Sequence, residues 1–394
     1  MLRQWAAMLF CGLLFWSGVE SANGYNLRRY TFPTSSSQEA FINGAFNLSG
    51  ESEDTTQTGY SFSGTATYDM FYRSLPFTYF INSRGNFAFM RATQDDADGT
   101  EGFDGLLRVR GNKYFTREHK WFAFGASKLE YRKLQSSSKA DDPYWDVTAG
   151  LGYGRSIDAT VLKQAIRINQ DFKRFGVISS DIPEEFLQQL ARVIDRQSEF
   201  RSLYGIVEYR KYWYGAMEDV IRDAGVLIED GLGAVGLIRV QEVLAEPTGR
   251  RFHGWEVRGG GGVVLSDFSG EAGDPLASAE FDWALPYTIN LQFSNSIYSR
   301  TVFAEDQSWT AGDIFQIYYE LTNRLDWDNS LQAEYNVAEP LPDSWDATFT
   351  STFIFYLENQ LTFNPSLIVN YFDVDGQDSK SNWTLLGSIS YRLK

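Results

Sequence analysis

The stretch YSFSGTATYDMFYR (residues 60–73) alternates between apolar and polar side chains with a period of two. Because successive side chains of a strand point to opposite faces, this period predicts a strand with one apolar and one polar face. The apolar face carries Tyr60, Phe62, Gly64, Ala66, Tyr68, Met70 and Tyr72, and Phe71 is the one exception on the polar face. The fold therefore depends on what covers the apolar face, a protein core or lipid.

The same alternation recurs along most of the chain. It is present in YTINLQFSNSIYS (287–299), in LTFNPSLIVNYF (361–372) and again between Trp383 and Leu393. We predict about fourteen such strands, within a range of 12 to 16. The six before the middle of the chain cover about 39–48, 58–73, 76–91, 102–116, 120–134 and 144–155, and the eight after it cover about 252–265, 276–285, 287–301, 312–325, 328–338, 347–357, 360–372 and 382–393.

Three features favour a transmembrane β-barrel over a soluble β-sandwich. The predicted strands are about 10 to 16 residues long, whereas soluble strands usually have about 5 or 6. Aromatic residues gather near the ends of the apolar faces, where membrane barrels carry interfacial girdles. Strands cross lipid only in a closed barrel, because an open edge leaves backbone groups unpaired. The expected fold is therefore an all-antiparallel transmembrane β-barrel.

The N-terminus has the layout of a secretory signal peptide, which we assign to residues 1–22. Arg3 precedes an apolar run from Trp5 to Val19, and small residues follow it. A retained membrane anchor is the alternative, although fifteen apolar residues are short for a span. Cleavage would remove Cys11, the only cysteine, and leave a mature chain without disulfides or cysteine-ligated metal.

The connections between the predicted strands alternate in length. Odd-numbered connections are long, as in ATQDDADGTEG (92–102), AEPLPDSWD (338–346) and FDVDGQDSKS (372–381). Even-numbered connections are short, as in SLP (74–76) and LP (285–286). Long outer loops and short inner turns are typical of outer-membrane barrels, so the even connections are expected on the periplasmic side.

One even connection changes period and becomes helical. In GYGRSIDATVLKQAIRINQDF (152–172) the apolar residues pass from strand to helix spacing, and four helices are predicted before residue 247. This divides the mature chain into a first half-barrel (23–156), a helical insert (157–249) and a second half-barrel (250–394). The insert is expected at the periplasmic end or folded into the lumen as a plug.

The third predicted helix, about 198–224, carries a cluster of candidate docking residues. These are Lys211, Tyr212, Trp213 and Tyr214. Such a cluster is suited to a periplasmic or inner-membrane protein or to a lipid headgroup surface, whereas a packed bundle core is the alternative for at least two of its members.

The long connections are strongly acidic. By the predicted boundaries they carry 21 acidic residues and two basic ones, Lys139 and Lys380, in a chain of formal net charge −16. The acidic candidates are Asp95, Asp96, Asp98, Asp373, Asp375 and Asp378. This charge argues against nucleic acid as a partner. It favours a solvated outer surface bridged to lipopolysaccharide by divalent cations, with attraction of cations to a pore mouth as the alternative.

Ionisable residues also occur on the polar faces of the predicted strands, where they would line the lumen. They are Arg84, Asp104, Arg108, Arg110, Lys128, Glu130, Arg132, Glu256, Arg258, Glu280, Asp282, Glu320, Arg324 and Glu334. Opposite charges in a barrel wall can pair across strands as structure, or can set selectivity in a wet pore. Both interpretations remain open at this stage.

Little in the sequence points to catalysis or to a cofactor. Only two histidines are present, His119 in an expected turn and His253 at the start of a strand, and neither is placed for a serine–histidine site. DVDGQD (373–378) has Thr384 where a calcium loop needs glutamate. The four glycines of GGGG (259–262) are expected at a sharp bend or where a plug helix packs closely. We therefore predict no enzyme, no metal site and no bound cofactor.

In architecture the chain resembles the Gram-negative outer-membrane β-barrel channels, the porin-like class. The resemblance covers about three quarters of the mature chain, and it departs from many members in ending YRLK rather than in phenylalanine. It implies an outer-membrane location and a role in transport, with the helical insert as a gate or docking domain. Two alternative hypotheses are a component of surface polysaccharide export and a barrel that sheathes a periplasmic electron-transfer partner.

Overall fold

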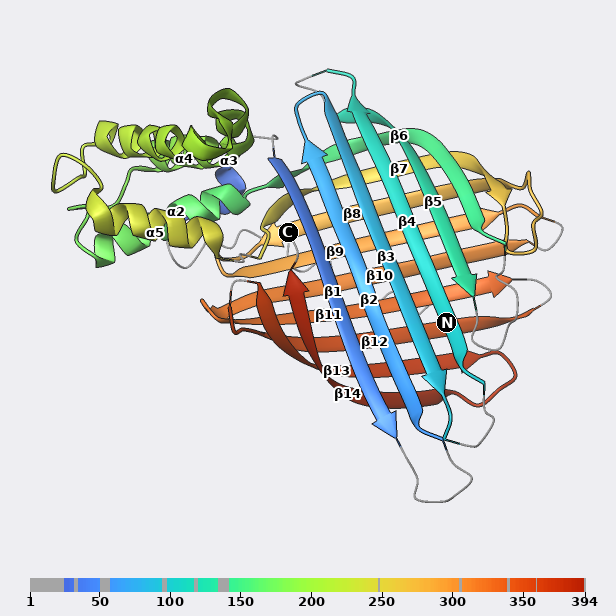
Figure 1. The fold of residues 1–394 in the computed structure, drawn as a ribbon. Helices are drawn as coiled ribbons and strands as arrows, with labels where there is room; N and C mark the ends of the chain where they lie inside the picture. The colour runs from blue at the N-terminus through green and yellow to red at the C-terminus, as the bar shows by residue number, and fades with distance from the viewer. Residues whose placement is uncertain are drawn as a thin grey trace.

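The protein is a closed barrel of fourteen antiparallel strands with four α-helices beside one end (Figure 1). The computed structural model describes residues 25–31, 35–49, 57–93, 98–116, 120–133, 142–246, 249–304, 307–338, 341–358 and 360–392. The predicted fold class is confirmed, because the barrel is closed, all its strand pairs are antiparallel and the helices lie between β6 and β7. Cys11, Asp95, Asp96, His119 and Lys139 lie outside the described residues.

Every strand pairs with its neighbours in the chain, and β1 also pairs with β14. The strands are β1 (Ser35–Ser49), β2 (Gly59–Arg73), β3 (Phe77–Arg91), β4 (Thr100–Tyr114), β5 (Trp121–Lys133), β6 (Tyr144–Asp158), β7 (Phe252–Ser266), β8 (Pro275–Pro286), β9 (Leu291–Val302), β10 (Ser308–Thr322), β11 (Leu325–Ala338), β12 (Leu341–Tyr356), β13 (Leu361–Val374) and β14 (Lys380–Arg392). The even connections form short turns at the helical end, as in residues 74–76 and 323–324.

One predicted outer loop is wrong. Residues 341–346 of AEPLPDSWD belong to β12, and Ala338 of β11 faces Leu341 of β12 across the ladder. The pairing continues to the tip of this hairpin because Ser344, Trp345 and Asp346 find partners on β11. Polar composition alone suggested a loop here, whereas the strands extend as a ribbon beyond the apolar part of the wall.

The outward face of the barrel carries aromatic residues toward both ends of its strands. At the helical end, Tyr72 stacks on Tyr79 with ring centroids 5.4 Å apart, and Trp121, Tyr153 and Trp255 form a second chain of ring contacts. At the other end, which we call the acidic end, the outward rings that touch include Phe62–Phe89, Phe103–Tyr131 and Trp309–Tyr335. Apolar side chains such as Leu151 and Val109 lie exposed between these belts. Two aromatic girdles around an apolar band are the surface of a membrane-spanning barrel.

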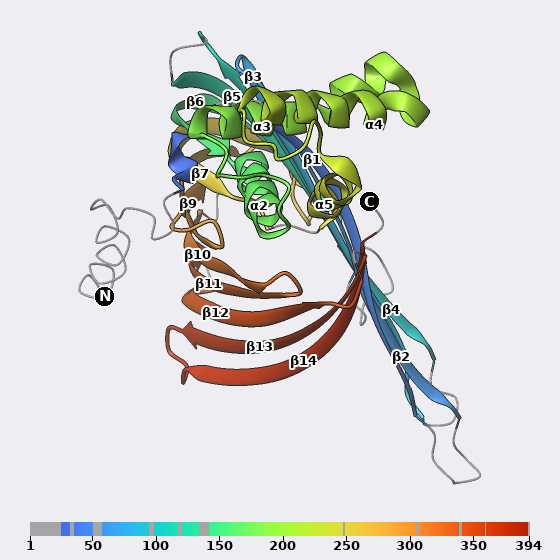
Figure 2. The same cartoon turned by 90° about the vertical axis from the view of Figure 1, so that its left-hand side faces the viewer.

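The barrel closes through a short seam. β1 and β14 pair at three positions, where Phe41, Ile42 and Asn43 face Arg392, Tyr391 and Ser390. Beyond this point the two strands diverge toward the acidic end (Figure 2). On the outward face of β14 this leaves Trp383 exposed by 72% and Leu385 by 70%.

Glycines on the inner face of β6 and β7 leave room for two large side chains of β5. A Cβ on Gly152 would lie 2.3 Å from the Phe122 ring, and one on Gly260 would lie 2.9 Å from the Phe124 ring. Phe122 and Phe124 of β5 are buried in these spaces. Gly152 thus makes room for Phe122, and Gly260 of the glycine run makes room for Phe124. The expected close approach of a plug helix does not occur among the described residues.

We expect Gly152→Val to destabilise the barrel by about 1–3 kcal/mol, because the new side chain overpacks Phe122 and the Val257 carbonyl. Gly125→Val in β5 is the control, since nothing lies within 4 Å of a Cβ there. The temperature at which heat-modifiable gel migration is lost measures both. Equal midpoints for the two variants would contradict the proposed role of the glycines.

The four helices of the insert form a compact domain with a core of its own. They are α2 (Thr160–Arg174), α3 (Glu184–Asp195), α4 (Gln197–Asp223) and α5 (Gly233–Ala245). Each presents residues such as Ile166, Leu190, Met217 and Val240 to this core. None of the helices in the described ranges is long and apolar enough to cross a membrane.

The core of the helical domain continues into the barrel rim and the N-terminal segment. Leu27 and Tyr30, around the short 3-10 helix η1 (Leu27–Arg29), are buried in it, as is Ile289 from the β8–β9 turn. His253 of β7 contacts the Tyr30 carbonyl at 2.7 Å, and Arg29 pairs with Glu184 at 2.7 Å. The domain lies outside the strands, beyond one end of the barrel (Figure 1).

Candidate pore constriction and helical platform

Charged residues of β4 and of the non-adjacent strands β7 and β8 meet inside the helical half of the barrel. Strand alternation and register place Arg110 of β4 and the residues Glu256, Arg258, Glu280 and Asp282 of β7 and β8 on the inner face. Arg258 pairs with Glu280 at 2.9 Å, with Glu256 at 3.6 Å and closely with Asp282. Arg110 reaches Glu280 at 3.3 Å, although three strands lie between β4 and β8. This charge cluster therefore bridges the lumen.

Aromatic rings extend the bridge toward the helical rim. Arg73 at the end of β2 donates to the Ser156 carbonyl of β6 at 2.9 Å, and its guanidinium lies 4.8 Å from the centroid of the Phe252 ring. Phe71 contacts Phe252 edge-on, with centroids 6.1 Å apart. Tyr114 of β4 donates to Glu256 at 3.3 Å. Side chains of β2 and β4 thus meet those of β6 and β7 inside the barrel near the helical rim.

The inner face of β12, β13 and β14 is hydrophilic but carries few charges. Its inward hydroxyl and amide groups form a ladder across β12, β13 and β14, in which Thr348 donates to Asn370 at 3.0 Å and Asn370 donates to Asn382 at 2.8 Å. Thr352 and Ser366 share a hydrogen bond of 2.8 Å. A charged wall and a neutral polar wall thus face the same lumen.

The other expected lumen residues pair locally or lie elsewhere. Lys128 pairs with Glu130 at 2.7 Å, Asn86 donates to Asp104 at 2.7 Å and Tyr298 donates to Glu334. The Arg132 guanidinium lies 3.7 Å from the centroid of the Phe268 ring. Register places Arg84 and Arg108 on the inner faces of β3 and β4. The prediction that Arg324 lines the lumen is wrong, because this residue lies in the exposed β10–β11 turn at the helical end.

Several residues of the constriction were not expected from the sequence. They are Arg73, Tyr114 and Arg155. Arg300, also unexpected, pairs with Asp146 at 2.8 Å nearer the acidic end. Phe71 could have been found, because it is the single aromatic residue on the polar face of residues 60–73. An apolar ring on a lumen face needs a packing partner, and here Phe252 and Arg73 provide it.

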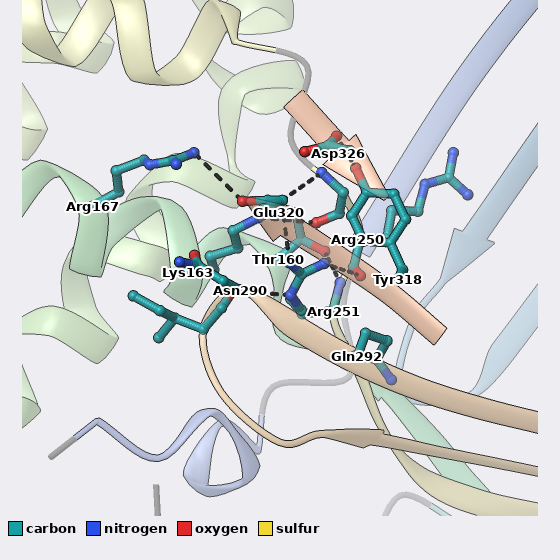
Figure 3. A network of polar contacts seen from close by, with 12 residues as sticks. Thr160, Lys163, Arg167, Arg250, Arg251, Asn290, Gln292, Tyr318, Glu320 and Asp326 are labelled. Atoms are coloured by element: carbon teal, nitrogen blue, oxygen red, sulfur yellow. Dashed lines mark hydrogen bonds and ion pairs between the residues drawn. The ribbon is translucent and has the colours of Figure 1, made fainter. Parts of the chain in front are cut away.

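A buried ionic network holds the helical domain on the barrel rim (Figure 3). Glu320 of β10 is 4% exposed and contacts three cations: Lys163 of α2 closely, Arg251 at 3.2 Å and Arg167 of α2 at 3.8 Å. The same carboxylate accepts from the Gly249 N–H at 3.0 Å. Arg251, fully buried, also donates to the Ile289 carbonyl at 2.9 Å. One carboxylate therefore joins α2, the segment before β7 and the barrel wall.

The excess of positive charge in this network has a consequence for Lys163. Burial, together with the nearby Arg251, lowers the pKa of Lys163 to about 7, and the attraction of Glu320 only partly opposes this. Arginine keeps its proton under all ordinary conditions, so lysine is the cation that can lose its charge.

The candidate docking cluster of α4 is divided by the fold. Trp213 is buried and donates to the Val193 carbonyl at 2.7 Å, so it belongs to the domain core. Tyr212 is exposed and stacks on Tyr204 with ring centroids 3.9 Å apart. Lys211 is exposed and Tyr214 half-buried. The four candidate residues therefore do not form one exposed docking surface. The exposed apolar residues of α4 lie earlier in the helix, before Lys211.

The described acidic candidates lie at the acidic end without forming a metal site. Asp98 precedes β4, Asp373 is the last residue but one of β13, and Asp375 and Asp378 follow in the β13–β14 turn. Within the described ranges, no group of three or more histidine, cysteine, aspartate or glutamate side chains could hold a metal ion.

The architecture and its outer surface define the class of protein: the chain has the porin-like outer-membrane β-barrel fold. No protein-family model matches the sequence, and no curated protein matches it. Among solved structures, it is similar to an outer membrane channel from Pseudomonas putida F1, with 9% identity, a TM-score of 0.33 and coverage of 95% of this chain and 100% of that one. For Acinetobacter baumannii OccAB1 the values are 6%, 0.31, 92% and 97%. Similarities this low carry no argument, and the assignment rests on the barrel itself.

We expect Glu320→Gln to weaken the attachment of the helical domain by about 3–5 kcal/mol, because it leaves buried cations without their carboxylate. Limited proteolysis of the folded barrel and its thermal midpoint measure the loss. Asp181→Asn is the control, because Asp181 forms an exposed pair with Lys173 that contributes little in water. Unchanged proteolysis of Glu320→Gln would show that the apolar core alone holds the domain.

The lowered pKa of Lys163 predicts a pH dependence of the same attachment. A lysine with a pKa near 7 when folded and near 10.5 when unfolded binds its proton more weakly in the folded state. Its contribution to stability therefore increases as the pH rises from about 7 to about 10 and is lost as the pH falls through that range.

Protease resistance of the helical domain at pH 6.5 and pH 9 tests this prediction. Lys163→Met should remove part of the difference in protease resistance between pH 6.5 and pH 9. Lys173→Met, on the surface, should leave this difference unchanged. If the pH dependence of Lys163→Met matches that of the unmodified protein, the assignment to Lys163 is wrong.

Proposed function

We propose that this chain is an outer-membrane channel for ions and small polar solutes. The observation that supports this best is the lumen with two unlike walls, in which Arg258, Arg110 and Glu280 face a ladder of hydroxyl and amide groups. Ionised groups that line a wet pore select permeating ions by sign, and neutral polar groups replace part of their hydration. On this proposal the acidic end faces the cell exterior, where divalent cations join its carboxylates to lipopolysaccharide.

In this proposal the helical domain is a fixed platform on the periplasmic rim rather than a swinging gate. A gate must open at low cost, whereas this domain is joined to the rim by the Glu320 network and by the buried residues Tyr30 and Ile289. Seen from the helical side, the helices lie before one part of the rim and leave β11–β14 uncovered (Figure 2). A platform of this kind is suited to receive a periplasmic or inner-membrane protein.

Single-channel conductance in planar bilayers tests the proposal, with the mature chain compared with a version lacking residues 158–246. We expect steady conductance from the mature chain. Conductance from the shortened version alone would make the domain a gate or plug. Silence from both would contradict a channel and would favour the alternatives, polysaccharide export or a sheath for an electron-transfer partner, neither of which needs ion conductance by the isolated chain.

Ion selectivity tests the constriction itself. Arg110→Gln should increase the preference for cations and Glu280→Gln should decrease it, each by up to about fivefold in permeability ratio, because a unit charge about 4 Å away in water contributes about 1 kcal/mol. Lys133→Gln is the matched control, since Lys133 and its partner Glu101 lie on the outward face of the wall. If the permeability ratio changes by the same amount in all three variants, Arg110 and Glu280 are not the charges that determine selectivity.

A further inference from the structure

A kink in α4 creates an exposed apolar tip on the helical domain. Gly205 adopts φ 74° and ψ 170°, a backbone conformation that side chains with a Cβ rarely adopt. Around it Leu203, Ile206 and Val207 are exposed by 67%, 70% and 92%. Exposed apolar residues grouped in this way usually mark an interaction surface. We refer to residues 201–211 as the α4 tip.

The α4 tip contributes to the domain core only through Tyr209. Core contacts of this helix lie on both sides of the exposed segment. Phe200 packs against the core before it, and the buried residues that follow it, spaced by one helical turn, are Tyr209, Trp213, Met217 and Ile221. All eight residues from 201 to 208 are exposed. Packing of the domain therefore does not explain why the sequence SLYGIV (202–207) is apolar.

The charged residues of the α4 tip indicate which kind of surface it can bind. The tip carries three basic residues, Arg201, Arg210 and Lys211, and one acidic residue, Glu208. The whole chain, by contrast, has a formal net charge of −16. Apolar side chains flanked by arginine and lysine fit the boundary between anionic lipid headgroups and acyl chains.

The position of the tip agrees with this chemistry. In Figure 1 the kinked end of α4 is on the side of the helical domain that faces the barrel. In Figure 2 α4 extends beyond the edge of the wall formed by β1, so its end does not lie over the lumen. The outward aromatic belt of Tyr72 and Tyr79 marks the membrane boundary at this same end of the barrel.

We propose that the α4 tip is a membrane anchor, whose Leu203, Ile206 and Val207 insert into the anionic leaflet next to the helical end of the barrel. The Glu320 network joins the domain to the wall at one side, and the tip joins it to lipid at the other. The inference requires that the barrel spans a membrane, but it does not require that the barrel conducts.

A single fluorescent label at the tip tests the proposal in the full mature chain. Removal of residues 1–22 also removes Cys11, so Val207→Cys gives the only thiol. The labelled protein is placed, one copy per disc, in lipid nanodiscs of phosphatidylglycerol or of phosphatidylcholine. We expect a blue-shifted emission, protection from an aqueous quencher and quenching by a lipid-attached quencher in phosphatidylglycerol. Replacement of Arg201, Arg210 or Lys211 by glutamine should weaken this preference about fivefold per residue.

Ile228→Cys is the matched control, because Ile228 is 58% exposed in the segment that follows the other end of α4. Its label should remain in water in both lipids. A tip label that remains in water in phosphatidylglycerol would overturn the proposal and leave a protein partner as the occupant. If the tip label is protected from the aqueous quencher only in discs that hold two copies, the proposal is wrong and the tip binds a second copy of the chain.

Discussion

The need to pair every backbone group in lipid is the constraint on which this structure depends. An N–H or C=O left open in the membrane core costs several kcal/mol, so strands can enter lipid only as a closed ring. Thirteen of the fourteen junctions meet this need with long ladders between chain neighbours, but the junction of β1 with β14 meets it with three pairs. The seam is thus the least supported part of the wall, and Trp383 and Leu385 beside it are the most exposed of its outward side chains.

Closure also determines what the lumen contains. A ring of fourteen strands is wider than the eight-stranded barrels that side chains fill completely, and narrower than the open porins of 16 to 18 strands. In this barrel of intermediate width, the large side chains that meet across the lumen are not spread evenly around the wall. Glycines in β6 and β7 leave room on the inner face for Phe122 and Phe124. Arg73 and Arg110 then reach across to β6 and β8, where Arg258 also pairs with Glu280. The neutral wall of β12–β14 remains as the hydrophilic side of the passage.

Local periodicity was sufficient to predict the strands, the helices and their order. Each predicted strand overlaps an observed one, because alternation and a 3.6-residue period are properties of neighbouring residues. Contacts between distant residues were not predictable in this way. Glu320 looked like one more lumen charge, yet it lies at the rim because the register of β10 and the docking of α2 bring Lys163 to it. The prediction for Arg324 was wrong for a similar reason, since the turn lies three residues earlier than predicted and Arg324 is therefore outside the wall.

The helical domain shows how a buried charge can fix geometry without adding much stability. Apolar residues of similar size at Lys163, Arg251 and Glu320 could attach the domain at least as strongly, because transfer of charges from water offsets most of their attraction. Apolar surfaces, however, tolerate rotation and sliding, whereas a carboxylate shared by three cations and the Gly249 N–H accepts few arrangements. The network therefore determines the angle at which α2 leaves the rim. That angle in turn determines where α4 ends, and so places the apolar tip at the side of the barrel rather than over its mouth.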